Sequence, residues 1–336
     1  MRLEYTDVPE PEVTPGEVLI AVRACGICGS DVHGLDGSTG RRRPPIIMGH
    51  EASGVIARVG DGVTAWREGD RVTFDSTIYC GECAYCRAGR INLCDNRRVL
   101  GVSCEDYRRH GAFAELVAVP ERVLYRLPDS LDFEHAAMAE PVSIALHAVA
   151  RAGVKPGESA AVVGAGMIGL LIVRALRLVG CHPLIAVDVD PGKLEMAKSM
   201  GATHTVDAST GDVSSTIVSL SEHGGVDHAF EAVGMSATVA TAMKATRKGG
   251  SVTLVGNLSP QIDFALQCAV TRELTLYGSC ASNGEYPQCL DLIASGEINV
   301  RPLISATATL SNGAAWFSRL YKKEPGQMKV ILHPEA

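Results

Sequence analysis

The stretch AAVVGAGMIGLL, residues 160–171, decides the fold of the second half of this chain. It places Gly164, Gly166 and Gly169 in the spacing G-x-G-x-x-G, between an apolar strand-like run and the start of an apolar helix-like run. The first glycine permits a tight turn, the second lets the backbone approach a pyrophosphate, and the third allows the helix to pack closely on the sheet. The N-terminus of that helix would then face the phosphates of a bound dinucleotide.

An acidic residue at the end of the next strand-like run strengthens this interpretation. Asp188, in LIAVDVD, lies 19 positions after Gly169, where dinucleotide-binding chains place the acid that accepts hydrogen bonds from a ribose. No arginine follows in residues 189–192, so the motif predicts NAD rather than NADP. Met167 and Ile168 complete the predicted cofactor-binding set. A turn with incidental glycines is the alternative, and the coincidence of strand, turn, helix and acid disfavours it.

The pattern around this motif divides the chain. After about residue 145, strand-like and helix-like runs alternate, which is typical of a parallel sheet with helical crossovers. Before that point, short Val- and Ile-rich runs are separated by Gly, Pro and Asp turns, which predicts an antiparallel, β-rich domain. We therefore predict an α/β chain with a doubly wound parallel sheet over 144–280. The β-rich domain is predicted over 1–143 and 281–336.

Bulk composition narrows the functional class. Of 336 residues, 46% are hydrophobic and 21% are charged, and the net charge is −7. Nucleic-acid binding needs a dense basic surface, so we predict a small-molecule substrate and no nucleic-acid partner. The sequence has neither a signal-peptide-like start nor about 18 consecutive apolar residues, so we expect no membrane association and a cytoplasmic location. In that reducing compartment, the eleven cysteines stay thiols unless a metal or catalysis engages them.

Four cysteines crowd into the segment CGECAYCRAGRINLC, residues 80–94. The spacing C-x2-C-x2-C-x7-C lets all four sulfurs converge on one ion. Four thiolates suit tetrahedral zinc and leave no open coordination position, so the predicted role is structural. An iron–sulfur cluster is an alternative, whereas a redox pair would need a thioredoxin-like pattern that is absent. The predicted structural zinc ligands are Cys80, Cys83, Cys86 and Cys94.

A second set of ligand-type residues precedes this loop. The segments ACGICGSDVH and IIMGHEASG supply Cys28, Ser30, Asp31, His33, His50 and Glu51. One thiolate, one imidazole and one carboxylate can hold a zinc ion and leave a position open for water or a substrate oxygen. A lone Cys or His is more often an ordinary core or loop residue. Here both are followed by polar, glycine-flanked positions that a simple core would not favour.

Together these motifs resemble the zinc-dependent medium-chain dehydrogenases, and among them the branch of polyol, sorbitol-like and threonine dehydrogenases. The resemblance covers nearly the whole chain and rests on GICGSDVH, MGHEASG, VGDGV with GDRV, the four-cysteine loop, AEP and GAGMIGLL. It implies a GroES-like catalytic domain and a Rossmann NAD-binding domain. It also implies two zinc ions per chain, one catalytic and one structural, and oxidation of a secondary alcohol, a polyol or sugar alcohol, to the ketone with NAD.

The resemblance implies a role for several residues that match the functional positions of the family. Cys28 and His50 would be catalytic zinc ligands, and Asp31 matches the carboxylate that orients the ligating histidine. Glu140 of MAEP stands where typical alcohol dehydrogenases have another cysteine, which points to the polyol branch. Which carboxylate binds zinc stays open: we expect Glu140 to coordinate directly or through water, and Glu51 to ligate in some states.

Further expectations concern the proton path, the loops and the assembly. Ser30 and His33 match the hydroxyl and imidazole that pass the alcohol proton to solvent. The arginine run 41–43 is predicted to be a solvated loop, with a contact to a substrate phosphate as the minority alternative. Cys104 and Tyr107 are predicted to be loop residues without a role. The family implies a homo-oligomer, a tetramer or a dimer, assembled through an edge of the Rossmann sheet.

Two alternatives to polyol oxidation stay open. The first is an L-threonine 3-dehydrogenase or an alcohol dehydrogenase with a simpler substrate. The second is a catalytically inert, zinc-stabilised binding protein that kept the fold and lost the chemistry. The intact set of ligand-type residues disfavours the inert protein.

Overall fold

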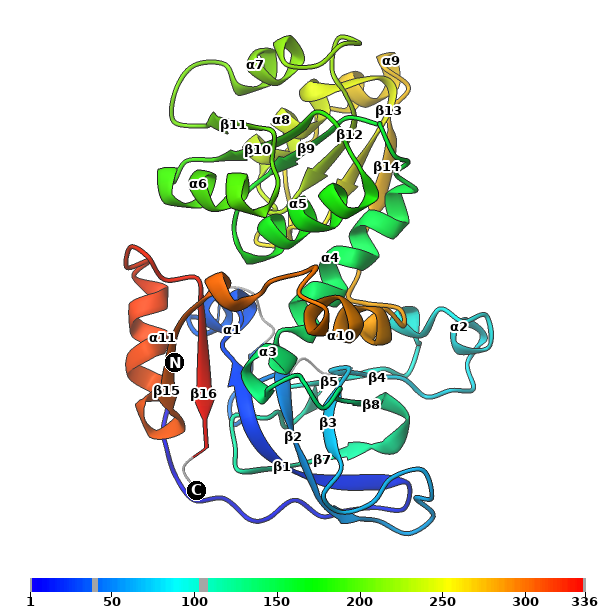
Figure 1. The fold of residues 1–336 in the computed structure, drawn as a ribbon, viewed down its shortest axis with the longest axis vertical. Coiled ribbons are helices and arrows are strands. Elements are labelled where there is room, and N and C mark those ends of the chain that lie inside the picture. Colours follow the sequence, from blue (N-terminus) through cyan, green and yellow to red (C-terminus); the bar gives the residue numbers. More distant parts are fainter. Residues whose placement is uncertain (1, 38–41, 103–107, 335–336) are drawn as a thin grey trace. The chain divides into compact units, whose positions relative to one another are not determined.

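The computed structural model describes residues 2–37, 42–102 and 108–334. Some of the predictions concern residues outside these ranges, namely Arg41, Cys104 and Tyr107. The chain forms two compact units, one of Met1–Ser143 with Ser282–Ala336 and one of Ile144–Ala281 (Figure 1). In the described ranges, no helix has the length and apolar character needed to cross a membrane.

The unit that contains the glycine-rich turn is built on a six-stranded sheet in the order β11-β10-β9-β12-β13-β14. All neighbouring strands are parallel, and this strand order is that of a doubly wound dinucleotide-binding fold. The strands are β9 (Ala160–Val163), β10 (Leu184–Asp188), β11 (His204–Asp207), β12 (Val226–Glu231), β13 (Thr246–Leu254) and β14 (Thr275–Gly278). The helices are α5 (Met167–Val179), α6 (Pro191–Met200), α7 (Val213–Ser219), α8 (Ser236–Ala245) and α9 (Leu266–Thr271), preceded by α4 (Ala139–Ala152).

Helices cover both faces of this sheet, which explains why its inner strands read as continuous apolar runs. The helices α5 and α6 pack together, whereas α8 packs with α7 and α9 (Figure 1). All four residues of β9 are buried. The helix signals also follow the sequence: Asp190 caps α6, Pro191 opens it, and Gly201 in the left-handed region ends it.

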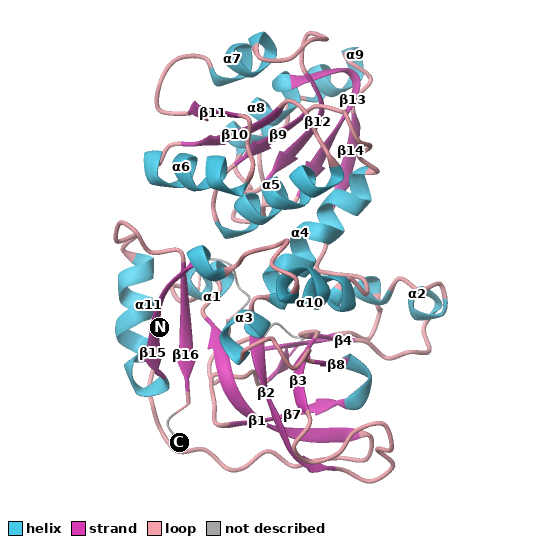
Figure 2. Cartoon of the chain, viewed as in Figure 1, coloured by secondary structure: helices cyan, strands magenta, loops and turns pink. Residues whose placement is uncertain are grey.

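The other unit is rich in strands joined by long loops (Figure 2). Its described residues form a seven-stranded sheet in the order β15-β16-β1-β2-β3-β8, with β7 also paired to β1, and a three-stranded sheet β4-β5-β6. The strands are β1 (Glu17–Gly26), β2 (Glu51–Val59), β3 (Arg71–Phe74), β4 (Thr77–Ile78), β5 (Arg98–Leu100), β6 (Arg108–Arg109), β7 (Leu116–Pro120), β8 (Leu124–Arg126), β15 (Ile304–Thr309) and β16 (Lys329–His333). The helices are α1 (Gly29–Gly34), α2 (Ala84–Arg87), α3 (Phe133–Ala137), α10 (Tyr286–Ala294) and α11 (Gly313–Tyr321), with 3-10 turns at Ile91–Leu93, Glu121–Val123, Arg301–Leu303 and Leu310–Asn312.

Pairing at one end of β1 gathers three distant segments. Gly26, the last residue of β1, pairs with Glu51, the first residue of β2, and also with Ile331 of β16. The chain therefore leaves β1 toward α1 at the place where it enters β2. An apolar cluster of α1, α11 and β16 residues, including Val32, Phe317 and Val330, packs beside this junction.

Candidate functional site

Three side chains converge beside this junction. Cys28 Sγ, a ring nitrogen of His50 and a carboxylate oxygen of Glu51 all lie within 4.8 Å of one another. The histidine is 6% exposed and the glutamate 1%. These residue types hold a catalytic zinc ion while leaving one coordination position open. The structure therefore groups three of the four predicted catalytic ligands, and Glu140 is not part of this group.

Two turns position the ligands. Cys28 is the N-cap of α1: its Sγ accepts from the Ser30 amide at 3.5 Å, and its own amide donates to Asp31 Oδ2 at 3.3 Å. This reciprocal capping fixes the direction of the thiol. Before His50, Gly49 has a φ of 96°, and a Cβ there would come within 2.6 Å of a backbone nitrogen in the facing loop. Only glycine fits such a position, so the turn that delivers the imidazole is fixed.

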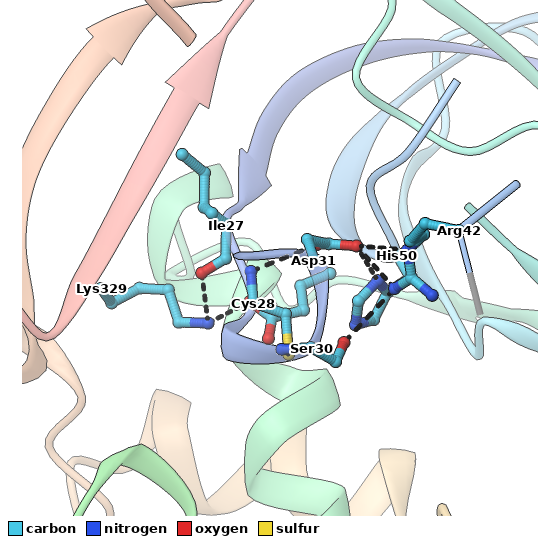
Figure 3. A network of polar contacts seen from close by, with 8 residues as sticks. Ile27, Cys28, Ser30, Asp31, Arg42, His50 and Lys329 are labelled. Atoms are coloured by element: carbon cyan, nitrogen blue, oxygen red, sulfur yellow. Dashed lines mark hydrogen bonds and ion pairs between the residues drawn. The ribbon is translucent and has the colours of Figure 1, made fainter. Parts of the chain in front are cut away.

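A buried carboxylate links the imidazole to an arginine (Figure 3). Arg42 Nη2 donates to Asp31 Oδ1 at 2.7 Å, and His50 Nδ1 lies 3.5 Å from the same oxygen. No well-aligned hydrogen bond reaches His50 Nδ1 from the described residues. Burial alone would raise the pKa of Asp31, but His50 and Arg42 outweigh it and lower that pKa to about 2. Burial alone would lower the pKa of His50, yet Asp31 and Cys28 raise it well above its usual value.

The arginine run does not behave as one solvated loop. Arg43 is exposed, as predicted, but Arg42 is buried and its side chain is only 3% exposed. The prediction of a solvated loop is therefore wrong for Arg42. A guanidinium tolerates such burial when a carboxylate pairs with it, and its partner Asp31 lies in a different turn of the chain.

Glu51 is held by a lysine from the far end of the sequence. Lys329 Nζ, at the start of β16, donates to Glu51 Oε2 and to the carbonyl oxygen of Ile27 at 3.1 Å. The lysine is 2% exposed. Gly26 permits this contact, because a Cβ there would come within 2.3 Å of Glu51 Oε2. The carboxylate thus has a fixed counter-charge close to the candidate metal position.

Other predicted residues lie near this centre. Glu140, in the first turn of α4, is partly buried, and loss of hydration raises its pKa to about 8 despite the attraction of His50. Glu51 adds to this rise, so two of the three grouped ligands, His50 and Glu51, affect the pKa of Glu140. Ser30 and His33 lie three residues apart on α1, on one side of that helix. The ligand role of Glu140 and the proton path through Ser30 and His33 stay predictions.

The four cysteines of residues 80–94 form a second group, whose sulfurs all lie within 4.8 Å of one another. Backbone amides point at the sulfurs: Cys83 N donates to Cys80 Sγ at 3.3 Å, Cys80 N to Cys94 Sγ at 3.2 Å, and Cys86 N to Cys83 Sγ at 3.5 Å. Amides of Glu82 and Cys83 lower the pKa of Cys80 to about 6. An amide also lowers the pKa of Cys83, whereas burial raises the pKa of Cys94 and raises that of Cys86 to about 12. The amides of the loop therefore favour the thiolate at Cys80 and Cys83.

Distances test whether this group suits zinc. Zinc–sulfur bonds of about 2.3 Å in a tetrahedron place the sulfurs roughly 3.8 Å apart. Cys80 Sγ and Cys86 Sγ are separated by 3.9 Å, so the cluster fits a four-coordinate zinc. The buried centre fits zinc through its donor set, because one thiolate, one imidazole and one carboxylate leave a position for a substrate oxygen.

The glycine-rich turn lies at the carboxyl end of β9, where the strand order reverses, which is where doubly wound folds bind their ligands. Gly164 has a φ of 99°. A Cβ on Gly169 would come within 1.8 Å of Gly164 O, so the helix can only approach the turn with glycine there. Asp188, at the end of β10, accepts from the amides of Ala165 at 2.8 Å and Asp190 at 3.0 Å. Its carboxylate is thus anchored beside the turn.

The helix after this turn begins without a side-chain cap. Gly166 is the N-cap of α5 and supplies no side-chain hydrogen bond, and Met167 and Ile168 form the first turn. Backbone amides of a first helical turn have no partner within the helix. Such amides are the donors that hold a pyrophosphate.

The sequence did not predict a role for three residues of these sites. Arg42 is one of three consecutive arginines, and Lys329 is a single charge within the apolar run MKVIL. Glu231 is fully buried at the end of β12 and accepts from the amides of Val233 at 3.0 Å and Gly234 at 2.8 Å. The pattern of an acid at the end of an apolar strand, which identified Asp188, would also have found Glu231.

Comparisons with known proteins agree with this arrangement. An alcohol dehydrogenase GroES-like domain matches residues 14–129, and a zinc-binding dehydrogenase domain matches residues 168–295. Sorbitol dehydrogenase of Bacillus subtilis (strain 168) is 34% identical over 337 aligned positions, which cover 99% of this chain and 94% of that protein.

Solved structures extend the likeness to the fold. The 2R,3R-butanediol dehydrogenase from Bacillus subtilis is 32% identical with a TM-score of 0.86, over 98% of this chain and 96% of that one. A Sinorhizobium meliloti 1021 protein assigned as a zinc-binding dehydrogenase, bound to NADP, is 36% identical with a TM-score of 0.88, over 97% and 94%. The predicted fold class, a GroES-like domain with a Rossmann-type parallel-sheet domain, is confirmed. The chain therefore belongs to the zinc-binding, medium-chain alcohol dehydrogenase family of enzymes.

Proposed function

We propose that this protein oxidises a secondary alcohol of the polyol class to the ketone, with NAD as the hydride acceptor. The observation that carries the proposal is the buried grouping of Cys28, His50 and Glu51. The sorbitol and butanediol dehydrogenases among its relatives support the substrate class. Polyol oxidation also fits Glu140, whose carboxylate stands near the ligand group instead of another thiol.

At this centre, the ligands would hold a zinc ion, which acts as a Lewis acid on an alcohol oxygen when it is bound. The chain's own residues prepare the site for it. Asp31 faces His50 and sets the orientation of the imidazole. Ser30, whose amide donates to Cys28 Sγ, would accept the alcohol proton. His33 on the same helix would pass that proton to solvent.

The four-cysteine loop would hold a second zinc ion with a structural role. All four positions of a tetrahedral ion are filled by Cys80, Cys83, Cys86 and Cys94, so no substrate atom can reach the metal. The loop contributes little apolar core, because the four residues of α2 are not buried. Metal binding would then supply the cohesion that packing does not.

The parallel-sheet unit would bind NAD in preference to NADP. The backbone amides at the uncapped start of α5 would hold the pyrophosphate, and Asp188 would accept hydrogen bonds from the ribose hydroxyls. A 2′-phosphate would meet this carboxylate without an arginine in residues 189–192. The Sinorhizobium relative was bound to NADP, so the preference of this chain for NAD has to be measured directly.

The proposal includes a homo-oligomer, a dimer or a tetramer, assembled through an edge of the parallel sheet in the cytoplasm. β14 ends that sheet in the described residues, and Leu276 on it is 37% exposed. Leu266 and Val270 on α9 are each 65% exposed. Apolar side chains at a sheet edge are features that a second copy could cover.

The experiment is a panel of polyols, simple alcohols and L-threonine with NAD or NADP, combined with zinc analysis of wild type, Cys28→Ala and Cys25→Ala. Cys25 is a buried thiol in the same segment outside the ligand group, so it is the matched control. We expect two zinc ions and NAD-dependent polyol oxidation in wild type and Cys25→Ala. Cys28→Ala should retain one zinc ion and no activity. Full activity in Cys28→Ala, or a wild type that oxidises none of these alcohols, would contradict the proposal.

A further inference from the structure

One guanidinium reaches two successive residues of α1 (Figure 3). Arg42 Nη2 and Nε donate to Asp31 Oδ1 at 2.7 Å and 3.2 Å, and Nη2 also lies 3.4 Å from Ser30 Oγ. The side chains of Arg42 and Asp31 are 3% and 0% exposed. A planar, permanently charged group with donors on two nitrogens suits such a double contact, which a point charge such as lysine cannot reproduce.

We propose that Arg42 is a positioning residue for the dehydrogenase reaction. Through Asp31 it orients His50, and through its hydrogen bond to Ser30 Oγ it holds the serine side chain in position. The inference rests on the proposed function, and it assigns to Arg42 a role that neither the motifs nor the relatives indicate.

The first part of the argument concerns charge. A histidine that ligates a metal must be neutral, so Asp31 then needs another counter-charge, because an unpaired buried carboxylate is costly. Arg42 is always protonated and provides it. Asp31 can therefore stay ionised and aim Oδ1 at His50 Nδ1, 3.5 Å away. The orientation of the imidazole toward the ligand group follows from this fixed carboxylate.

The second part concerns the serine hydroxyl. A hydroxyl has one hydrogen and two acceptor lone pairs, whereas a guanidinium can only donate. Ser30 Oγ must therefore accept from Arg42, which leaves its hydrogen and its second lone pair for other partners. A hydroxyl that relays a proton needs both of these, one to receive and one to donate. Arg42 thus holds Ser30 Oγ in place while leaving it able both to accept and to donate a proton.

The test compares Arg42→Met, Arg42→Lys and, as the matched control, Arg43→Met at the exposed neighbouring arginine. Removal of groups that orient a metal ligand typically costs on the order of 10- to 100-fold in activity or metal affinity. We expect Arg42→Met to lose this much in kcat with little change in KM, because ground-state alcohol binding is untouched. Zinc should also leave the site faster in a chelator. Arg42→Lys should recover part of both losses, and Arg43→Met should match wild type.

A double-mutant cycle with Asp31→Asn separates positioning from a general loss of packing. If Arg42 acts through Asp31, the double variant should lose less than the two single losses combined, because both remove the same interaction. Additive losses, or wild-type kcat and zinc release in Arg42→Met, would overturn the proposal. If Arg42→Met does not fold, wild-type behaviour of Arg42→Lys overturns it. Zinc release is measured without substrate, so it tests Arg42 even if the alcohol panel shows no oxidation.

Discussion

The two groups of metal-ligand side chains are built in opposite ways. The cysteine loop takes all of its ligands from residues 80–94, and its own amides bond to its sulfurs. The buried centre takes Cys28, His50 and Glu51 from two segments and adds Lys329 from a third. The loop is a local structure in which three of the four cysteines are half-buried, whereas the centre lies at the end of two paired strands of the largest sheet of its unit.

From this difference we infer that the two metals contribute differently to the stability of the fold. Strand pairing and ion pairs hold the buried centre in place without help from a metal. The loop has amides aimed at four thiols and few apolar contacts to replace a missing ion. Loss of metal should therefore unfold the loop locally, while loss of metal from the centre should remove function and leave the fold.

The largest expected effect on stability comes from removing one ligand of the cysteine loop. In Cys83→Ser one of four thiolates is lost, so we expect one zinc ion fewer per chain and a clear fall in melting temperature. The cost should stay below the about 10–16 kcal/mol of isolated zinc fingers, because the surrounding sheet folds without the loop. Zinc analysis and thermal melts measure both. Cys268→Ser, a half-buried thiol outside either group, is the control and should leave both unchanged. An unchanged melt with one zinc ion fewer would refute the structural role.

A smaller effect is expected at the junction. Lys329→Met keeps the length of the side chain and removes the charge that faces Glu51, so an uncompensated carboxylate stays buried. Removing one partner of a buried ion pair costs about 3–5 kcal/mol, and thermal melts should register this loss.

The same variant should be compared in zinc-loaded and in chelator-treated protein. A cation bound by Cys28, His50 and Glu51 would partly replace the lost ammonium, so the destabilisation should be smaller in zinc-loaded than in chelator-treated protein. Lys329→Arg, which keeps the charge, is the matched control. An equal loss in both zinc states would mean that Glu51 does not face the metal.

The same contrast explains how far the sequence could predict the molecule. Motifs whose parts are close in the chain, the cysteine loop and the glycine-rich turn with Asp188, carry their geometry in their spacing. The alternation of strands and helices was sufficient to predict the doubly wound sheet. Ligand types and the resemblance predicted Cys28, His50, Glu51 and Glu140 as catalytic ligands, and the structure groups the first three, whereas Glu140 is outside the group.

The supporting residues could not be predicted in this way. Lys329 is 278 residues from Glu51, and only the pairing of β16 with β1 brings them together. Arg42 lies in a run that resembles a solvated loop, and its burial depends on a carboxylate 11 residues away. Partners of this kind are set by tertiary packing, which local patterns do not encode.

The smallest expected effect is a change of stability with pH that comes from another buried carboxyl group in the same unit. Asp75, directly after β3, is 3% exposed and accepts from the Thr77 amide at 2.8 Å and from Ser282 Oγ at 3.1 Å. Burial raises its pKa from 3.8 to about 6. The folded protein thus binds this proton more tightly than the unfolded chain. The stability from this group is complete below about pH 4 and is lost as pH rises through about 6.

Asp75→Asn should therefore be more stable than wild type at pH 8, by at most about 3 kcal/mol for a shift of roughly two pKa units. The advantage should shrink to nothing near pH 4, where wild-type Asp75 carries its proton. An amide can keep both contacts, since its oxygen accepts from Thr77 and its nitrogen donates to Ser282. Asp70 is the control of opposite sign: its hydrogen bond from Arg126 lowers its pKa to about 2, so Asp70→Asn should lose stability at pH 8. Melting curves from pH 4 to 8 decide, and an Asp75→Asn advantage that does not vary with pH would show that this carboxyl is ionised throughout.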